Sequence, residues 1–327
     1  MAVKDAPGAP ELVEPPRSQW IKDTFGDETL QALQVASLTK PLIILRGEPG
    51  VGKSHLAVRM LDDDARERTC IVPVSATWRG REDLLGYVNP VTGRFEATPF
   101  TRFLIRAERA WKDGDRRAWL AVFEEFNLSQ PEHWLADILV VSQFQDALDR
   151  RLSLGGHGIG DDEGRVSVML SPAVRFLGTI NTDHTTRPLS PRILDRAAIV
   201  NLTLEPRAAL EVAHIELDAE QLSAIESLDR RIRRKGASFS VRSALSLRTC
   251  LSRREALGLD SWSALDLVLE QEVLSKVRLL ARDPLDEEAM ENLNEWSQED
   301  GSRLRRCAVL IEEWKEALAS GRDVIQA

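Results

Sequence analysis

From Pro41 to about residue 205, short apolar runs alternate with amphipathic segments, a pattern typical of a parallel sheet covered by helices. The apolar runs predict five strands, at 42–45, 70–74, 118–123, 174–180 and 197–202. Helical periodicity predicts helices near 27–38, 53–64, 100–112, 131–151 and 189–195. We therefore expect one α/β domain in this part of the chain.

Beyond Pro206 the strand pattern stops, and helical periodicity covers 207–234, 241–256, 262–282 and, with interruptions, 285–319. Residues 152–172 differ, because two short apolar runs flank a Gly- and Asp-rich turn, which predicts a β-hairpin before the fourth strand. The expected organisation is a disordered lead-in over 1–19, an α/β core over 20–205, a helical domain over 206–283 and a helical tail over 284–327.

The composition is that of an ordinary soluble globular chain: 327 residues, 43% hydrophobic and 29% charged. It excludes a collagen, a coiled-coil rod and a fully disordered polymer. No apolar run approaches the roughly 18 residues that span a bilayer, and the N-terminus lacks the basic start and apolar core of a signal peptide. Three cysteines without metal-like spacing are too few for a disulfide framework, so we expect a cytoplasmic protein with no membrane partner.

The charge balance is acidic, with a formal net charge of −9 and a sequence pI near 5.3. Proteins that wrap nucleic acid passively are usually basic. Any nucleic-acid contact is therefore expected to be local or delegated to a partner.

The segment GEPGVGKS fits the pattern G-x-x-x-x-G-K-[ST], between a predicted strand and a predicted helix. Glycines let the backbone curl so that several N–H groups face a phosphate at the positive end of a helix. Lys53 would reach the β- and γ-phosphates, and Ser54 would hold Mg²⁺. The candidate nucleotide-binding residues of this segment are Gly47, Glu48, Pro49, Gly50, Val51, Gly52, Lys53, Ser54 and His55.

Polar residues end two of the predicted strands. An enzyme that hydrolyses a nucleotide bound to such a phosphate loop needs one carboxylate for the magnesium and a second to orient the attacking water. Glu124 and Glu125 follow the third strand, and we assign Glu124 to the metal and Glu125 to the water. Asn181 ends the fourth strand, where an amide can point at the γ-phosphate or the water. Glutamate at 124, where aspartate is usual, is a methylene longer and leaves the metal geometry open.

With these motifs the sequence resembles the AAA+ ATPases, and more closely the McrB branch near the MoxR and dynein-like clades. GEPGVGKS resembles Walker A, and VFEEFNLSQPEHWLADIL resembles Walker B with its helix. Residues 74–100, with a Trp before Leu-Leu-Gly-Tyr and Thr-Pro-Phe, are similar to the McrB-type segment. Residues 178–200 resemble the sensor 1 strand and the arginine-bearing helix. The likeness covers about residues 20–282 and makes the helical domain a lid.

The resemblance implies roles for further residues. Asn181 would be sensor 1, and Arg242 would be the lid's sensor 2 arginine at the phosphates. Arg196 falls where such proteins place the arginine finger that reaches into the neighbouring subunit's site, and Arg192, one helical turn earlier, would share that role. Activity would then depend on a homo-oligomer, expected to be a hexameric ring.

Two departures limit what is carried over. McrB hydrolyses GTP and has Asn-Thr-Ala-Asp after the sensor strand, whereas this chain has Asn-Thr-Asp-His over 181–184. Most of the superfamily uses ATP, so we favour ATP over GTP. We expect the residues before the phosphate loop to be too few for a DNA-reading domain, so that recognition of modified DNA would need another subunit.

Three functions follow from these patterns. The first is the motor subunit of a McrBC-like restriction or defence system with a separately encoded nuclease. The second is a MoxR-like ATPase that remodels a protein client. The third is a nucleotide-gated scaffold with little hydrolysis, suggested by the glutamate at 124.

Weaker signals have structural alternatives of similar weight. The hairpin region carries Arg150, Arg151, His157 and Arg165, which either face a pore or are solvated. Trp78 and Tyr87 flank a Gly-containing loop, where core packing is the favoured interpretation and contact with a substrate or partner the alternative.

Overall fold

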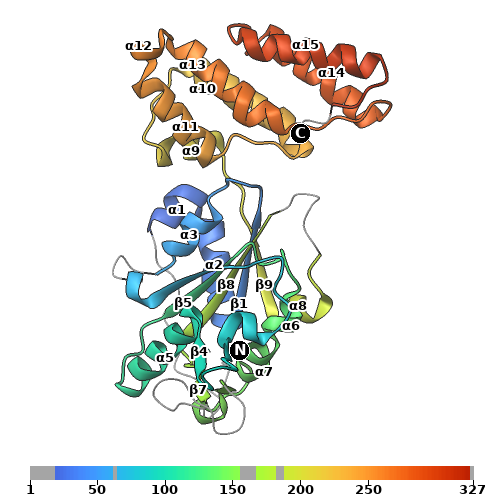
Figure 1. Ribbon diagram of the computed structural model, residues 1–327. Helices are drawn as coiled ribbons and strands as arrows, with labels where there is room; N and C mark the ends of the chain where they lie inside the picture. Colours follow the sequence, from blue (N-terminus) through green and yellow to red (C-terminus); the bar gives the residue numbers. More distant parts are fainter. Residues whose placement is uncertain (1–18, 62–64, 155–166, 182–187, 325–327) are drawn as a thin grey trace, which may run out of the picture. The chain divides into compact units, whose positions relative to one another are not determined.

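The computed structural model describes residues 19–61, 65–154, 167–181 and 188–324. These residues form two units (Figure 1). The first lies within Met1–Gly47 and Lys53–Leu202, and the second within Glu48–Gly52 and Thr203–Ala327. The predicted lead-in falls almost wholly outside the described residues, which begin with α1 (Gln19–Phe25).

The first unit is built on a five-stranded sheet in which every neighbouring pair is parallel. The strand order is β2-β5-β8-β1-β9, so the first strand of the chain lies between the fourth and the fifth. All five predicted strands are confirmed, with bounds β1 (Leu42–Gly47), β2 (Thr69–Pro73), β5 (Trp119–Glu124), β8 (Val174–Asn181) and β9 (Ala197–Asn201).

Alternation along the strands divides the sheet into two apolar faces. One face carries an aromatic core in which Phe123 and Phe176 stack with ring centroids 6.1 Å apart. This core includes residues of α5 (Pro99–Lys112), α6 (Pro131–Trp134) and α7 (Ala136–Val141). The strands also contact α2 (Asp27–Thr39) and α3 (Lys53–Val58).

Two predicted helices are shorter or more broken than their periodicity indicates. The helix expected over 53–64 ends at Val58, and three successive aspartates at 62–64 would oppose the negative end of a longer helix. The helix expected over 131–151 consists of α6, α7 and the 3₁₀ turn Ala147–Asp149. Asp146 caps that turn by accepting from the Leu148 N–H, which starts a new element. The helix near 189–195 is α8 (Pro191–Arg196).

Two small hairpins flank this sheet. The predicted hairpin is present as antiparallel β6 (Arg151–Ser153) and β7 (Ser167–Met169), while its tip, with His157 and Arg165, lies outside the described residues. A second hairpin, β3 (Gly86–Val88) with β4 (Phe95–Ala97), was not predicted. It follows the short helix α4 (Arg81–Leu85).

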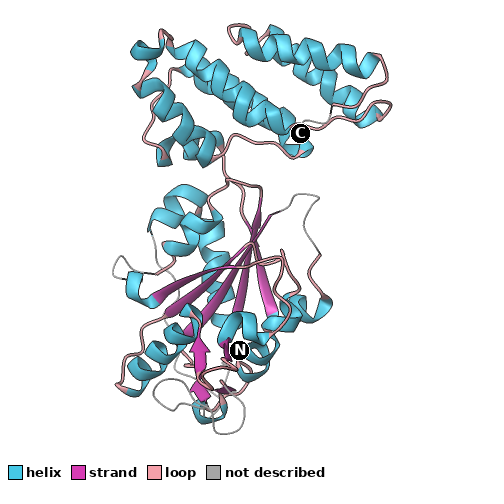
Figure 2. Cartoon of the chain, viewed as in Figure 1, coloured by secondary structure: helices cyan, strands magenta, loops and turns pink. Residues whose placement is uncertain are grey.

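The second unit is built from helices (Figure 2). Trp296 anchors its interior, since the ring is fully buried and its Nε1 donates to the Ala224 carbonyl at 3.0 Å. The helices are α9 (Pro206–Val212), α10 (Ala219–Ile232), α11 (Val241–Ser252), α12 (Arg254–Leu257), α13 (Ser261–Val268), α14 (Pro284–Gln298) and α15 (Arg305–Ala319). Residues 269–273 continue α13 as a π-helical turn.

Two further observations bear on the expected class of protein. Within the described residues, no helix has both the length and the apolar character required to cross a bilayer. The three cysteines are free thiols.

Candidate nucleotide-binding site

Four polar groups converge where α3 begins and where β5 and β8 end. The Ser54 hydroxyl donates to Glu124 Oε2 at 2.8 Å, and the Thr179 hydroxyl donates to the same oxygen at 2.9 Å. The Thr179 oxygen in turn accepts the backbone N–H of Glu125 at 3.1 Å. One threonine therefore holds both glutamates of the predicted acidic pair.

Strand pairing explains this convergence. Strands β5 and β8 are neighbours, with Phe123 opposite Gly178, so Glu124 and Thr179 occupy the next position on each strand. The carboxyl ends of adjacent parallel strands meet at one edge of a sheet, which is where α/β proteins bind ligands. Ser54 reaches that edge because α3 begins only a few residues after β1 ends.

The backbone at Glu125 is in the left-handed region, with a φ of 54°. Residues other than glycine adopt this region uncommonly, and such conformations cluster at functional sites. Here the Thr179 hydroxyl bonds the Glu125 N–H, and the next residue's N–H donates to the Thr179 carbonyl at 2.8 Å. The turn therefore ends β5 and leaves the Glu125 side chain exposed.

Lys53 and Asn181 lie beside the last residue of β1. The Lys53 side chain is almost completely buried, and its ammonium donates to the Gly47 carbonyl at 2.8 Å. Gly47 is paired in register with Asn181 on β8. The predicted lysine and the predicted strand-end amide are thus close to the same backbone position.

The remaining loop residues, Glu48–Gly52, belong to the second unit. Gly50 has a φ of +84°, and a Cβ there would lie 2.8 Å from the Ser240 Oγ, so glycine is the residue that this position accepts. The same Cβ would lie 3.7 Å from the Cβ of Arg242. The backbone of Arg242, in the first turn of α11, therefore lies next to the loop, and its side chain is exposed.

His55 follows Ser54 and has an aromatic neighbour. Its imidazole stacks on Trp20 of α1, with ring centroids 5.0 Å apart and 26° between the planes. The Arg59 guanidinium lies 4.9 Å from the centroid of the same tryptophan. Burial and the charge of Arg59 lower the pKa of His55 from its ordinary value. His55 therefore fastens α1 to α3.

The two candidate finger arginines lie on α8. Arg192 is exposed, and its carbonyl accepts from Arg196 Nη1 at 3.2 Å. The Arg196 Nε is buried and has no hydrogen-bond partner within the described residues. A buried guanidinium N–H without an acceptor is costly.

Thr179 is the residue that sequence reasoning missed. It is 2% exposed in a mostly apolar strand, two positions before Asn181 and so on the same face of β8. The available signal in the sequence was a polar residue on the same face of the strand as Asn181. Its importance depends on β8 lying next to β5, and local pattern does not report which strands are neighbours.

The donor set at this edge suits Mg²⁺ that arrives with a nucleotide. Mg²⁺ prefers oxygen ligands and is usually held by one or two carboxylates together with substrate phosphates. The Ser54 hydroxyl and the Glu124 carboxylate supply such oxygens in contact with one another. In the described part of the chain, no group of three or more His, Cys, Asp or Glu residues could hold a metal.

Comparison with known proteins adds similar structures. No protein-family model matches the sequence, and no curated protein matches it. A RuvB mutant from Thermotoga maritima is similar at a TM-score of 0.46 and 15% identity, over 78% of this chain and 73% of that chain. A chain of the E. coli MS115-1 HORMA:CdnC:Trip13 complex is similar at 0.37 and 17%, over 77% and 81%.

The strand order and the loop after β1 define the class. The chain has the fold of a P-loop NTPase: a five-stranded parallel sheet with the phosphate-loop sequence between β1 and α3, accompanied by a helical C-terminal region. The predicted fold class is confirmed.

Proposed function

We propose that the chain is a nucleoside triphosphate hydrolase of the AAA+ class, with ATP favoured over GTP and Mg²⁺ as the metal. The observation that carries this proposal is the hydrogen-bonded set of Ser54, Glu124 and Thr179, with Glu125 beside it. These hydrogen bonds can be replaced by bonds to a ligand, because a hydroxyl and a carboxylate that bond to one another can instead bind a metal–nucleotide complex. The lysine ammonium, which donates to the Gly47 carbonyl, can transfer to a phosphate oxygen.

Each side chain then has one task. Ser54 and Glu124 hold the metal, which when bound neutralises charge that develops on the phosphates. Lys53 pairs with the β- and γ-phosphates, and Asn181 orients the γ-phosphate or the water. Glu125 accepts a hydrogen bond from the attacking water and draws it into line with the γ-phosphate. Thr179 fixes both glutamates, and Arg242 contributes a positive charge from the lid.

We further propose that the active form is a ring, with Arg196, assisted by Arg192, completing the site of the neighbouring subunit. The support is the resemblance of residues 178–200 to the arginine-bearing helix and the exposure of Arg192 on α8. An arginine supplied in trans is worth about 10³–10⁵ in rate in related systems. Mixing inactive Glu125→Gln protein with inactive Arg196→Ala protein should restore part of the turnover, since some interfaces combine an intact finger with an intact glutamate. Mixtures that stay as inactive as the two variants would refute a finger acting in trans.

For the physiological role we propose the motor of a McrBC-like, nucleic-acid-targeting defence system with a separate nuclease. The support is the likeness of residues 74–100 and 178–200 to the McrB branch. Stimulation of hydrolysis by DNA together with such a nuclease is the expected result. Turnover that ignores both, with stable capture of a protein client, would favour the remodelling ATPase.

The direct test of the enzymatic proposal is phosphate release from ATP and from GTP. Removing a positioned proton acceptor typically costs about 10²–10⁴ in rate, so Glu125→Gln should lose turnover by that factor and still bind nucleotide. Glu67→Gln, an exposed glutamate in the same unit, is the matched control and should hydrolyse like the wild type. Equal rates for Glu125→Gln and Glu67→Gln would exclude the proposed water-orienting role. Binding without turnover in the wild type would instead favour the scaffold.

A further inference from the structure

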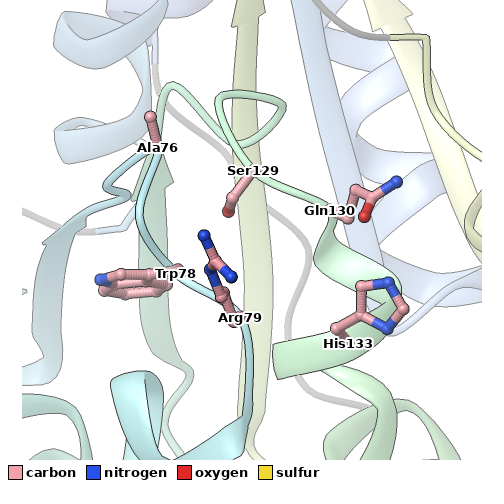
Figure 3. Close-up of a pocket in the computed structure, with 6 residues that line it drawn as sticks. All are labelled: Ala76, Trp78, Arg79, Ser129, Gln130 and His133. Atoms are coloured by element: carbon pink, nitrogen blue, oxygen red, sulfur yellow. The ribbon is translucent and has the colours of Figure 1, made fainter.

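The first unit contains a pocket that the proposed hydrolysis does not use. It has a volume of about 380 Å³ and is formed by the loops that follow β2 and β5 (Figure 3). None of the residues assigned to the triphosphate or the metal lines it. Its lining consists of Ala76, Trp78, Arg79, Ser129, Gln130 and His133.

Hydrogen-bond donors dominate this lining. Arg79, Gln130 and His133 are exposed, and within the described residues their side chains have no hydrogen bond or ion pair. The Ser129 oxygen already accepts from Trp134 Nε1 at 2.8 Å, so its own proton is available to a ligand. None of the six lining residues is acidic.

The position of Arg79 is set by its backbone. The Arg79 and Gly80 N–H groups both donate to Asp83 Oδ2, at 2.7 and 3.0 Å. This neighbouring carboxylate is therefore occupied by the loop itself. In Figure 3 the Arg79 guanidinium is directed toward Ser129, with Gln130 and His133 beyond it on the other side of the pocket.

An aromatic wall completes the pocket. Trp78 is half-buried and packs edge-to-face on the fully buried Trp134, with ring centroids 5.2 Å apart and 84° between the planes. The Trp78 ring packs against the core, as the favoured interpretation of the sequence expects. It also borders an open pocket, so contact with a ligand stays a prediction. A firmly held indole is a suitable surface for a nucleobase.

We propose that this pocket binds the phosphate group of a nucleotide, either within a single-stranded nucleic acid or as a free mononucleotide. Donors on several sides suit a tetrahedral oxyanion, and a guanidinium is the usual partner of phosphate. The volume lies within the range of small-molecule sites and leaves room for a sugar and a base beside Trp78. A local site of this kind would let a chain with a net charge of −9 make such a contact.

This inference does not rest on the proposed hydrolysis, so the test omits nucleoside triphosphates. The probe is a short oligothymidylate with hydroxyl ends and a fluorophore, followed by fluorescence anisotropy on the full chain. Loss of one charge-assisted hydrogen-bond partner should weaken binding about tenfold in Arg79→Ala. The salt dependence should also become shallower, by about 0.7 in log Kd per log salt.

Two further variants serve as a second disruption of the pocket and as a control. Gln130→Glu places a carboxylate in the pocket without changing its shape and should abolish binding. Arg102→Ala removes another exposed arginine of the same unit, on α5, whose side chain has no hydrogen bond or ion pair among residues 19–61, 65–154, 167–181 and 188–324, and should bind like the wild type.

Competition distinguishes the sources of the phosphate. Thymidine monophosphate should displace the oligonucleotide, whereas thymidine should not. Binding of thymidine monophosphate alone, with the same dependence on Arg79 and Gln130, would assign the pocket to free nucleotides. Binding of neither probe, or binding that the Arg79 and Gln130 variants leave unchanged, would overturn the proposal.

Discussion

The glutamates at the candidate site of the first unit are held differently from three buried aspartates of the second unit. In the first unit Glu124 is only partly buried, and its hydrogen-bond partners are the hydroxyls of Ser54 and Thr179. Its neighbour Glu125 is exposed, on a backbone turn that few residues other than glycine adopt. These groups can exchange partners with a ligand without unfolding anything around them.

In the second unit the carboxylates fasten the backbone. Asp229, Asp266 and Asp286 are 1%, 4% and 6% exposed. Asp229 accepts the Phe239 N–H at 2.7 Å, Asp266 accepts the N–H groups of the second and third residues of α15, and Asp286 accepts the Leu280 N–H. A buried carboxylate with backbone partners marks structure, whereas a half-exposed one with hydroxyl partners marks a place for a ligand.

The largest expected effect is on stability, and it tests the claim that the buried aspartates of the second unit are structural. Asp229→Ala leaves the Phe239 N–H without its acceptor and removes the buried carboxylate with which the Arg233 guanidinium pairs. Breaking a buried pair in this way costs about 3–5 kcal/mol in the free energy of unfolding. Urea unfolding followed by circular dichroism measures it.

Glu220→Ala is the control, because this glutamate pairs with Arg303 on the surface and should cost less than about 1 kcal/mol. A cost for Asp229→Ala no larger than that of the control would contradict the assignment of Asp229 as a structural carboxylate.

A smaller effect, on rate, is expected at Thr179. Thr179→Val keeps the shape of the side chain and removes the hydroxyl that links Glu124 to Glu125. A misplaced catalytic group can cost up to about 100-fold, so we expect hydrolysis to fall by about 10–100-fold. Thr179→Ser, which keeps the hydroxyl, should retain most of the rate. Equal losses in the two variants would show that packing, and not the hydrogen bond, is what matters at this position.

The smallest effect concerns pH. Burial and Arg59 lower the pKa of His55 below 6.5, so the folded chain binds fewer protons than the unfolded chain just below that pH. Stability should therefore decrease as the pH falls through this range. Because the imidazole is largely exposed, we expect less than about 0.5 kcal/mol. His55→Gln should show a smaller difference in Tm between pH 8 and pH 6 than the wild type, and an equal difference would contradict this account.

The fold was largely predictable because its signals are local. The five strands are continuous apolar runs, and the phosphate loop is a contiguous motif, so both are visible without knowing what lies next to them. The hairpin of β3 and β4 was not predicted because its three-residue strands lack between them the Gly- and Asp-rich turn that indicated the hairpin of β6 and β7. The break in 131–151 depends on a side-chain cap at Asp146, which periodicity does not report.

The sequence predicts the residues of the candidate site, but it does not predict the hydrogen bonds among them. Lys53, Ser54, Glu124, Glu125 and Asn181 were all named from motifs. That Glu124 bonds Ser54 and Thr179 follows from β8 lying between β5 and β1, a long-range arrangement. The pocket beside Trp78 likewise needs two loops that are some fifty residues apart in the chain.

The measurement closest to the central claim is the effect of Mg²⁺ on nucleotide affinity, because it needs neither a partner nor assembly. Binding of a fluorescent ATP analogue would be titrated with and without Mg²⁺, for the wild type and for Glu124→Gln. We expect Mg²⁺ to tighten binding to the wild type, and most of that gain to be lost in Glu124→Gln while the metal-free affinity stays the same. An equal gain in both proteins, or no nucleotide binding by the wild type, would contradict the assignment of Ser54 and Glu124 as the metal–nucleotide site.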